Sequence, residues 1–104
     1  MNRLLVFGVF FLLIACSSNI EKDIVGEWGG TIAQQDLVFY SDGRVDMKGH
    51  SHGVYQGVYK IENSNELTCT FPRLSKPVKS TAKISGDNLT LIFPSGRKES
   101  YLKK

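Results

Sequence analysis

The stretches KIENSNELTCTF (residues 60–71) and KISGDNLTLIF (residues 83–93) decide the fold of this chain. In both, a Lys-Ile pair is followed by a short polar turn and then by Leu-Thr-x-x-Phe. Apolar side chains alternate with threonine at a period of two, which is typical of strands with one buried face. Because tight polar turns favour antiparallel neighbours, each stretch is predicted to be a β-hairpin. The repeat of this unit predicts an up-and-down sheet.

The same alternation continues in both directions, broken by turn residues such as Asp42-Gly43. No window holds the apolar spacing of an amphipathic helix over three turns. We therefore predict an all-β domain over residues 24–104. It is expected to be an antiparallel up-and-down meander that closes into a small eight-stranded barrel, with a two-sheet sandwich as the alternative. The predicted strands are 25–33, 36–41, 44–49, 53–62, 66–72, 77–85, 88–94 and 97–103.

Strand parity assigns one apolar face, which barrel closure would bury. Cys69 lies between Leu67 and Phe71 on this face and is expected to be a small buried hydrophobe rather than a reactive thiol. The parity of the last strand stays open, because residues 97, 99 and 101 compete with residues 100 and 102. Short strands and many inward aromatic side chains predict a filled core, with any ligand at the open rim. The other inward members are Trp28, Ile32, Phe39, Tyr59 and Phe93.

The chain opens with Met1-Asn2-Arg3, followed by an uncharged apolar run over residues 4–15 and by Cys16. A cationic start and about a dozen apolar residues have the proportions of a secretory signal peptide. The run is too short for a membrane-spanning helix, which needs about 20 residues. We predict a signal peptide over residues 1–15 and a polar tether over residues 16–23.

The residues Leu13-Ile14-Ala15-Cys16 resemble the lipobox of bacterial lipoproteins. The resemblance implies cleavage after Ala15, a diacylglyceryl thioether on Cys16 and acylation of the new amino group. Ser17 in place of aspartate implies sorting to the outer membrane, facing the periplasm. An ordinary secretory signal with a coincidental cysteine is the alternative. With Cys16 lipidated, Cys69 has no partner for an intramolecular disulfide.

Gly26-Glu27-Trp28 opens the first predicted strand as Gly-x-Trp. This motif resembles the entry of lipocalins and the wider calycin group, and the whole pattern resembles the small lipocalin-like domains of bacterial lipoproteins. The resemblance implies an up-and-down barrel in which Trp28 plugs one end. It also implies that a late arginine, here Arg97, covers the tryptophan ring in a cation–π contact. The matching segments are 26–28, 37–45, 57–61, 67–71 and 89–93.

The formal charge of +3 falls to +2 once Arg3 is removed with the signal peptide. This surplus is too small to indicate nucleic-acid binding. Many cations gather in the C-terminal half, where they either face anionic headgroups or cell-wall polymers, or serve as solubilising charges on the sheet. They are Arg73, Lys76, Lys79, Lys83, Arg97, Lys98, Lys103 and Lys104.

His50 and His52 are candidate metal ligands, because residues two apart on an extended segment point the same way. Asp46 is the third candidate, and copper, zinc or nickel would suit such a set. A glycine-flanked His-Ser-His is also typical of a polar hairpin loop. A firm metal site would need further ligands with supporting hydrogen bonds.

We expect no enzyme activity and no cofactor beyond the lipid on Cys16, since no catalytic constellation is evident. The leading hypothesis is a membrane-anchored, non-catalytic binding or interaction module of the cell envelope. A metal-binding envelope protein is one alternative, and an inhibitor or immunity protein against a hydrolase or toxin is another. Four tyrosines either form an exposed recognition patch or line the barrel and its rim. They are Tyr40, Tyr55, Tyr59 and Tyr101.

Overall fold

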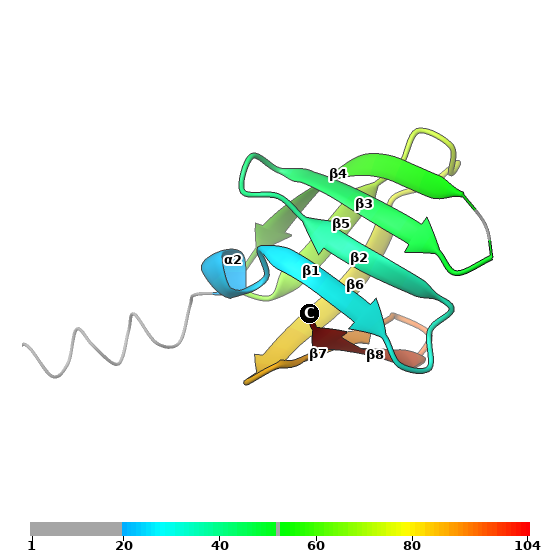
Figure 1. The fold of residues 1–104 in the computed structure, drawn as a ribbon. Coiled ribbons are helices and arrows are strands. Elements are labelled where there is room, and N and C mark those ends of the chain that lie inside the picture. The colour runs from blue at the N-terminus through cyan, green and yellow to red at the C-terminus, as the bar shows by residue number, and fades with distance from the viewer. Residues whose placement is uncertain (1–19, 52) are drawn as a thin grey trace, which may run out of the picture.

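A computed structural model describes residues 20–51 and 53–104, which form a closed antiparallel meander (Figure 1). The predicted signal peptide, Cys16 and His52 lie outside the described residues. A one-turn helix, α2 (Ile20–Asp23), precedes the sheet. The strands are β1 (Gly26–Gly30), β2 (Gln35–Phe39), β3 (Arg44–Gly49), β4 (Val54–Glu62), β5 (Glu66–Thr70), β6 (Val78–Ser85), β7 (Asn88–Ile92) and β8 (Lys98–Lys103).

The barrel closes because β8 pairs with β1 as well as with β7. In this closing pair, Trp28 lies opposite Lys103 and Gly30 opposite Tyr101. Every strand therefore has two antiparallel neighbours, and the sheet has no free edge. The predicted eight-stranded barrel is confirmed, and the sandwich alternative is excluded.

Seven of the predicted strands agree with the observed ones to within two residues at each end. The exception is the first, which was expected to run to residue 33 with Ile32 inside. The strand ends at Gly30, whose amide donates to the side-chain carboxylate of Asp36 on β2 at 3.1 Å. Ile32 consequently lies in the following loop with 82% of its surface exposed, so its predicted inward position was wrong.

Two glycines meet demands that other residues would satisfy poorly. Gly43 follows Asp42 in the β2–β3 turn with φ of +96°, in the region that glycine tolerates without strain. Gly57 lies in the middle of β4, where a Cβ atom would overlap the carbonyl oxygen of Thr70 on β5. The absence of a side chain at residue 57 therefore allows the two strands to approach closely at this point.

The core fills the barrel with inward side chains, as strand parity predicted. Tyr101 is completely buried while Leu102 is 47% exposed, so the inward set of β8 is Glu99 and Tyr101. Cys69 is also buried, and burial raises the pKa of its thiol to about 12. The remaining buried apolar residues are Ile24, Trp28, Leu37, Phe39, Val45, Leu67, Phe71, Ala82, Leu89 and Leu91.

The meander gives the barrel two distinct ends (Figure 1). We call the end beside α2 the proximal end; it carries the β2–β3, β4–β5 and β6–β7 turns. The distal end carries the four loops β1–β2, β3–β4, β5–β6 and β7–β8. Among the described residues, no helix has the length and apolar character needed to cross a bilayer.

Candidate functional site

Trp28 occupies the proximal part of the core. Its side chain is completely buried, and its indole Nε1 donates to the carbonyl oxygen of Ile24 at 2.8 Å. Ile24 is itself completely buried at the junction between α2 and β1. The ammonium nitrogen of Lys103 lies 5.3 Å from the indole centroid, within cation–π range. This group of residues holds the start of the domain against the barrel.

Arg97 does not take the position over Trp28 that the lipocalin resemblance implied. It lies at the distal end, where its guanidinium carbon is 4.4 Å from the ring centroid of Phe93. The antiparallel register explains the difference, since it sets Lys103 and not Arg97 opposite Trp28. The late cation over the tryptophan is therefore Lys103.

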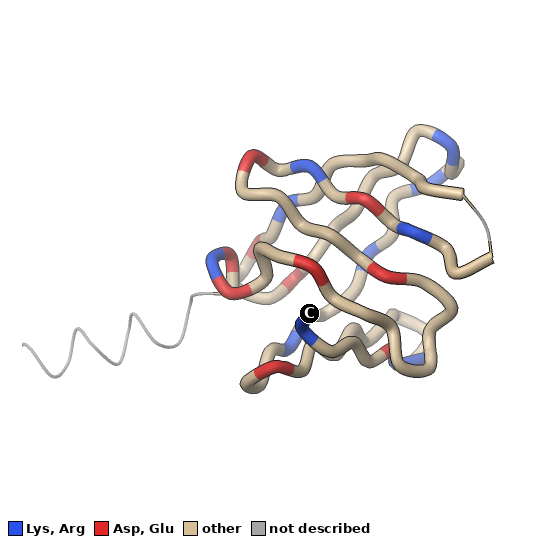
Figure 2. The backbone as a smooth tube through the Cα atoms, viewed as in Figure 1, with Lys and Arg blue, Asp and Glu red and all other residues tan. Residues whose placement is uncertain are grey.

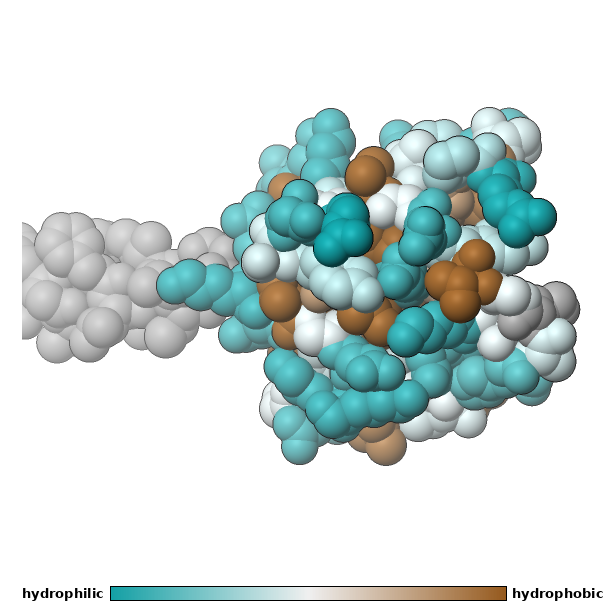
Figure 3. Space-filling model, turned by 45° about the horizontal axis from the view of Figure 1, so that its top comes forward, coloured by the Kyte–Doolittle hydropathy of each residue, from teal (hydrophilic) through white to brown (hydrophobic). Residues whose placement is uncertain are grey.

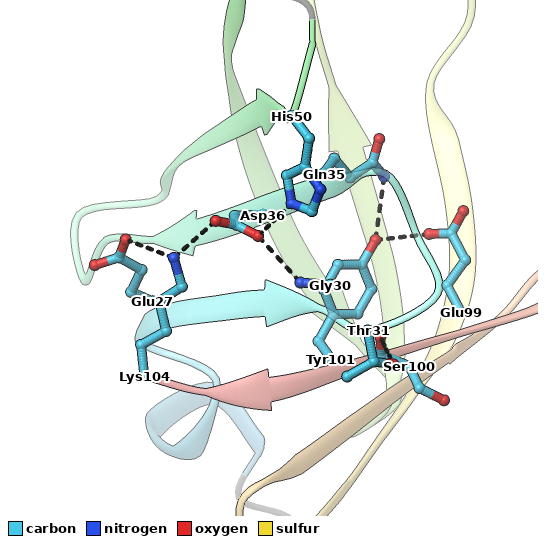
Figure 4. Close-up of polar contacts among 10 residues, drawn as sticks. All are labelled: Glu27, Gly30, Thr31, Gln35, Asp36, His50, Glu99, Ser100, Tyr101 and Lys104. Atoms are coloured by element: carbon cyan, nitrogen blue, oxygen red, sulfur yellow. Dashed lines mark hydrogen bonds and ion pairs between the residues drawn. The ribbon is translucent and has the colours of Figure 1, made fainter.

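A chain of hydrogen bonds crosses the distal mouth of the barrel (Figure 4). The Gln35 amide donates to the Tyr101 hydroxyl at 3.1 Å, and this hydroxyl donates to a Glu99 carboxylate oxygen at 2.7 Å. The other Glu99 oxygen accepts from Arg97 at 2.6 Å. Burial, followed by the hydrogen bond to Glu99, raises the pKa of Tyr101. The hydroxyl therefore stays neutral and connects β2 with β8.

The space beneath this chain is small. A cavity of about 60 Å³ lies between the mouth and the core, with mostly apolar walls and polar contributions from Ser80 and Glu99. Pockets for small-molecule ligands usually measure about 300–1,000 Å³. The interior is thus occupied by side chains, and binding of a lipocalin-type ligand inside the barrel would require repacking of the core.

The distal loops expose apolar and aromatic side chains around the mouth. Ile32 is 82% exposed and Leu74 is 36% exposed, and the guanidinium of Arg73 lies 5.2 Å from the Tyr55 ring centroid. A shallow hollow of about 160 Å³ lies beside Tyr55 and Met47. We call these five residues the distal rim: Ile32, Met47, Tyr55, Arg73 and Leu74.

The candidate metal ligands have other partners. His50 Nε2 lies 2.9 Å from an Asp36 carboxylate oxygen, and Asp46 accepts a hydrogen bond from the Tyr40 hydroxyl at 3.0 Å. His52 lies outside the described residues. Across residues 20–51 and 53–104, no three potential ligands form a group suited to a metal ion. Metal binding by His50 and His52 stays a prediction.

Asp36 is the centre of an ionic cluster on the outer wall (Figure 4). Its carboxylate accepts from Lys104 at 2.7 Å, lies against His50 and also accepts from the Gly30 amide. These contacts, Lys104 first, lower the pKa of Asp36 to about 2. Lys104 also lies 3.7 Å from Glu27. The cluster joins β1, β2, the β3–β4 loop and the C-terminal residue.

The four tyrosines do not form one exposed patch. Tyr101 is buried, and the Tyr59 hydroxyl donates to the carbonyl oxygen of Tyr40 at 2.9 Å. The Tyr59 ring also meets Phe39 edge-on at 5.0 Å between centroids. Tyr55 alone contributes to the distal rim. The recognition-patch interpretation was therefore wrong for Tyr59 and Tyr101, which line the barrel.

Sequence reasoning missed three residues that organise these sites. Gln35 and Asp36 stand at the start of a strand, and their polar side chains carried no motif. Lys103 was counted among the C-terminal cations but was not connected with Trp28. An assigned register for the last strand would have revealed this pair, because β8 alone brings the C-terminal residues next to β1.

No model of a protein family matches the sequence, and the search of curated proteins finds no significant relative.

Proposed function

We propose that this chain is a lipid-anchored, non-catalytic interaction module of the cell envelope that contacts a protein partner through its distal rim. One observation carries the proposal. The barrel interior retains a cavity of only about 60 Å³ beneath the mouth, whereas Ile32 and Leu74 expose apolar surface on the loops around it. Recognition is therefore assigned to the outside of the mouth and not to the interior.

The chemistry of the rim supports this assignment. Tyrosine, arginine and methionine are enriched at protein interfaces, and the rim contains Tyr55, Arg73 and Met47. By contrast, the face shown in Figure 3 presents its apolar side chains as isolated groups among hydrophilic ones. Scattered apolar residues of this kind are ordinary on protein surfaces.

The position of the rim also supports the proposal. The distal loops lie at the end of the barrel opposite α2, through which the chain would continue to an anchor on Cys16 (Figure 1). A partner can approach this end without meeting the tether. The Glu99 carboxylate at the mouth is engaged by Arg97 and Tyr101, which is consistent with a non-catalytic role.

The test is chemical cross-linking in cells of the native host, comparing two double variants. Ile32→Ser with Leu74→Ser removes apolar surface from the rim. Val58→Ser with Leu102→Ser is the matched control, because these side chains are 56% and 47% exposed but lie on the barrel wall. We expect a cross-linked partner with the unmodified chain and the control, and at least a tenfold loss with the rim variant. Equal cross-linking by both variants would contradict the proposal.

The identity of the cross-linked partner decides between two forms of the module. If it is a hydrolase or toxin whose activity falls on binding, the chain is an inhibitor or immunity protein. If its activity is unchanged, the chain acts in recruitment or assembly.

A further inference from the structure

Three lysines lie on the outer faces of β6 and β8, and the acidic residues Glu62 and Glu66, on β4 and β5, border this surface beside Lys79. Lys79 and Lys83 lie on β6 and Lys98 on β8, all exposed, while the alternate residues Ser80 and Ala82 are buried. We call these three residues the lysine wall. Within the described strands β6, β7 and β8, the other outward positions are hydroxyl, amide or apolar residues: Thr81, Ser85, Asn88, Thr90, Ile92, Ser100 and Leu102.

The lysine wall differs from the opposite wall in how its charges are compensated. Lys79, Lys83 and Lys98 form no ion pair with any described residue. On the opposite side, the acids Glu27, Asp36 and Asp46 lie on β1, β2 and β3, which face the viewer in Figure 2. Lys79, Lys83 and Lys98 thus lie on the side of the barrel away from Glu27, Asp36 and Asp46, with Glu66 on β5 as an acidic neighbour.

The spacing of the lysines suits an extended anionic surface. Lys79 and Lys83 are four residues apart on one strand, which corresponds to roughly 13 Å. Lys98 pairs with Ile92, which pairs with Thr81, so it lies two strands away, at roughly 10 Å. Because one phosphate group cannot reach all three, a surface with many separate anions is the complementary partner.

The start of the domain lies at the proximal end of the barrel and contacts one strand of the lysine wall. The helix α2 contacts β6, the strand that carries Lys79 and Lys83. Cys16 stands four residues before Ile20, so even a fully extended connection would span only about 14 Å. An anchor on Cys16 would keep the wall within reach of electrostatic attraction, which extends about 10 Å at 0.1 M salt.

We propose that the lysine wall binds an anionic phospholipid bilayer, so that the anchored barrel lies on its side against the membrane. The proposal rests on the membrane anchor of the proposed function but not on the distal rim. A lysine near an anionic surface strengthens binding roughly fivefold, so three together correspond to about 100-fold. In this orientation the acidic strands β1–β3 face away from the bilayer.

The experiment measures lysine acetylation on protein tethered to vesicles. Residues 16–104 are coupled through Cys16 to maleimide lipid, while Cys69 stays unmodified because it is buried. Vesicles of phosphatidylcholine alone are compared with vesicles that contain about 30% phosphatidylglycerol, an anionic lipid. The acetylation rate of each lysine by a water-soluble reagent is followed by mass spectrometry.

We expect acetylation of Lys79, Lys83 and Lys98 to slow at least fivefold on anionic vesicles at 0.05 M salt and to recover at 0.5 M salt. Lys48 and Lys60, which lie on β3 and β4, are the internal controls and should keep their rates. Equal rates on both vesicles, or equal slowing of every lysine, would overturn the proposal.

A soluble polyanion is the competing occupant. Protection of the lysine wall by polyphosphate or RNA on neutral vesicles, stronger than that by phosphatidylglycerol, would also overturn the proposal. Because no protein partner is present, the result is independent of the distal rim. A matched pair of triple variants completes the test: Lys→Gln at residues 79, 83 and 98 should release the barrel from anionic vesicles. Removal of the same amount of charge by Arg44→Gln, Lys48→Gln and Lys60→Gln should leave the barrel bound to anionic vesicles.

Discussion

The two ends of the barrel are closed by different chemistry. At the proximal end, Ile24 and Trp28 are completely buried, and one indole hydrogen bond fixes their arrangement. At the distal end, a polar chain from Gln35 through Tyr101 to Glu99 crosses the mouth. An apolar plug stabilises the fold through burial of apolar surface. A network of hydrogen bonds stabilises it only when every polar group in the network has a hydrogen-bond partner. The comparison indicates that stability is concentrated proximally, which leaves the distal loops available for recognition.

The largest expected effect comes from removing the proximal plug. Trp28→Ala should lower the free energy of unfolding by about 3–5 kcal/mol, because it leaves a large cavity in a packed core. Since Trp28 is the only tryptophan, unfolding in urea should be followed by circular dichroism and not by fluorescence. If the variant does not fold, Trp28→Phe provides the measurement, with an expected loss of about 2 kcal/mol.

The control for this prediction is an aromatic truncation at the other end. Phe93 packs against the core from the distal side and is only partly buried. Phe93→Ala should therefore lower the free energy of unfolding clearly less than Trp28→Ala does. Equal losses at both ends would show that stability is spread evenly along the barrel and would contradict its concentration at the proximal end.

A smaller effect is expected from breaking the distal chain. Tyr101→Phe removes a buried hydroxyl and leaves both the Gln35 amide and one Glu99 oxygen without this partner. The free energy of unfolding should fall by about 1–2 kcal/mol, the usual cost of an unsatisfied buried polar group. Tyr55→Phe is the control at the same end, because no hydrogen bond of the Tyr55 hydroxyl is found among the described residues. This variant should change the free energy of unfolding by less than about 0.5 kcal/mol. An unchanged free energy of unfolding in Tyr101→Phe would mean that the hydrogen bonds across the distal mouth do not stabilise the fold.

The fold was largely predictable because its determinants are local. The repeated hairpin pattern and the turn at Asp42-Gly43 set the strands and their inward faces without knowledge of distant contacts. The first strand was extended too far because its end depends on Asp36, which captures the Gly30 amide across the loop. This side-chain contact leaves no trace in the alternation of apolar residues.

The candidate sites were less predictable because they depend on barrel closure. Trp28 and Lys103 meet only through the pairing of the first and last strands. The parity of β8 was open in the sequence, where Tyr101 and Leu102 are equally plausible core residues. Only closure of the barrel decides that Tyr101 points inward. The same parity of β8 brings the Tyr101 hydroxyl to the Gln35 amide and directs Lys98 onto the outer wall.

The smallest expected effect is a pH dependence of stability that arises from Asp36. The contacts of its carboxylate join His50 in the β3–β4 loop to the C-terminal residue, Lys104. Because the pKa of Asp36 is lowered from 3.8 to about 2, its contacts stabilise the fold fully above pH 4 and are lost as the pH falls toward 2. The contribution should be about 1 kcal/mol, since Lys104 and His50 are partly exposed. Chemical denaturation of the unmodified chain and of Asp36→Asn should therefore differ at pH 6 and converge near pH 2. If the difference in free energy of unfolding between the two proteins did not change with pH, Asp36 would act through shape and hydrogen bonding alone. Its charge would then not contribute to joining the β3–β4 loop to Lys104.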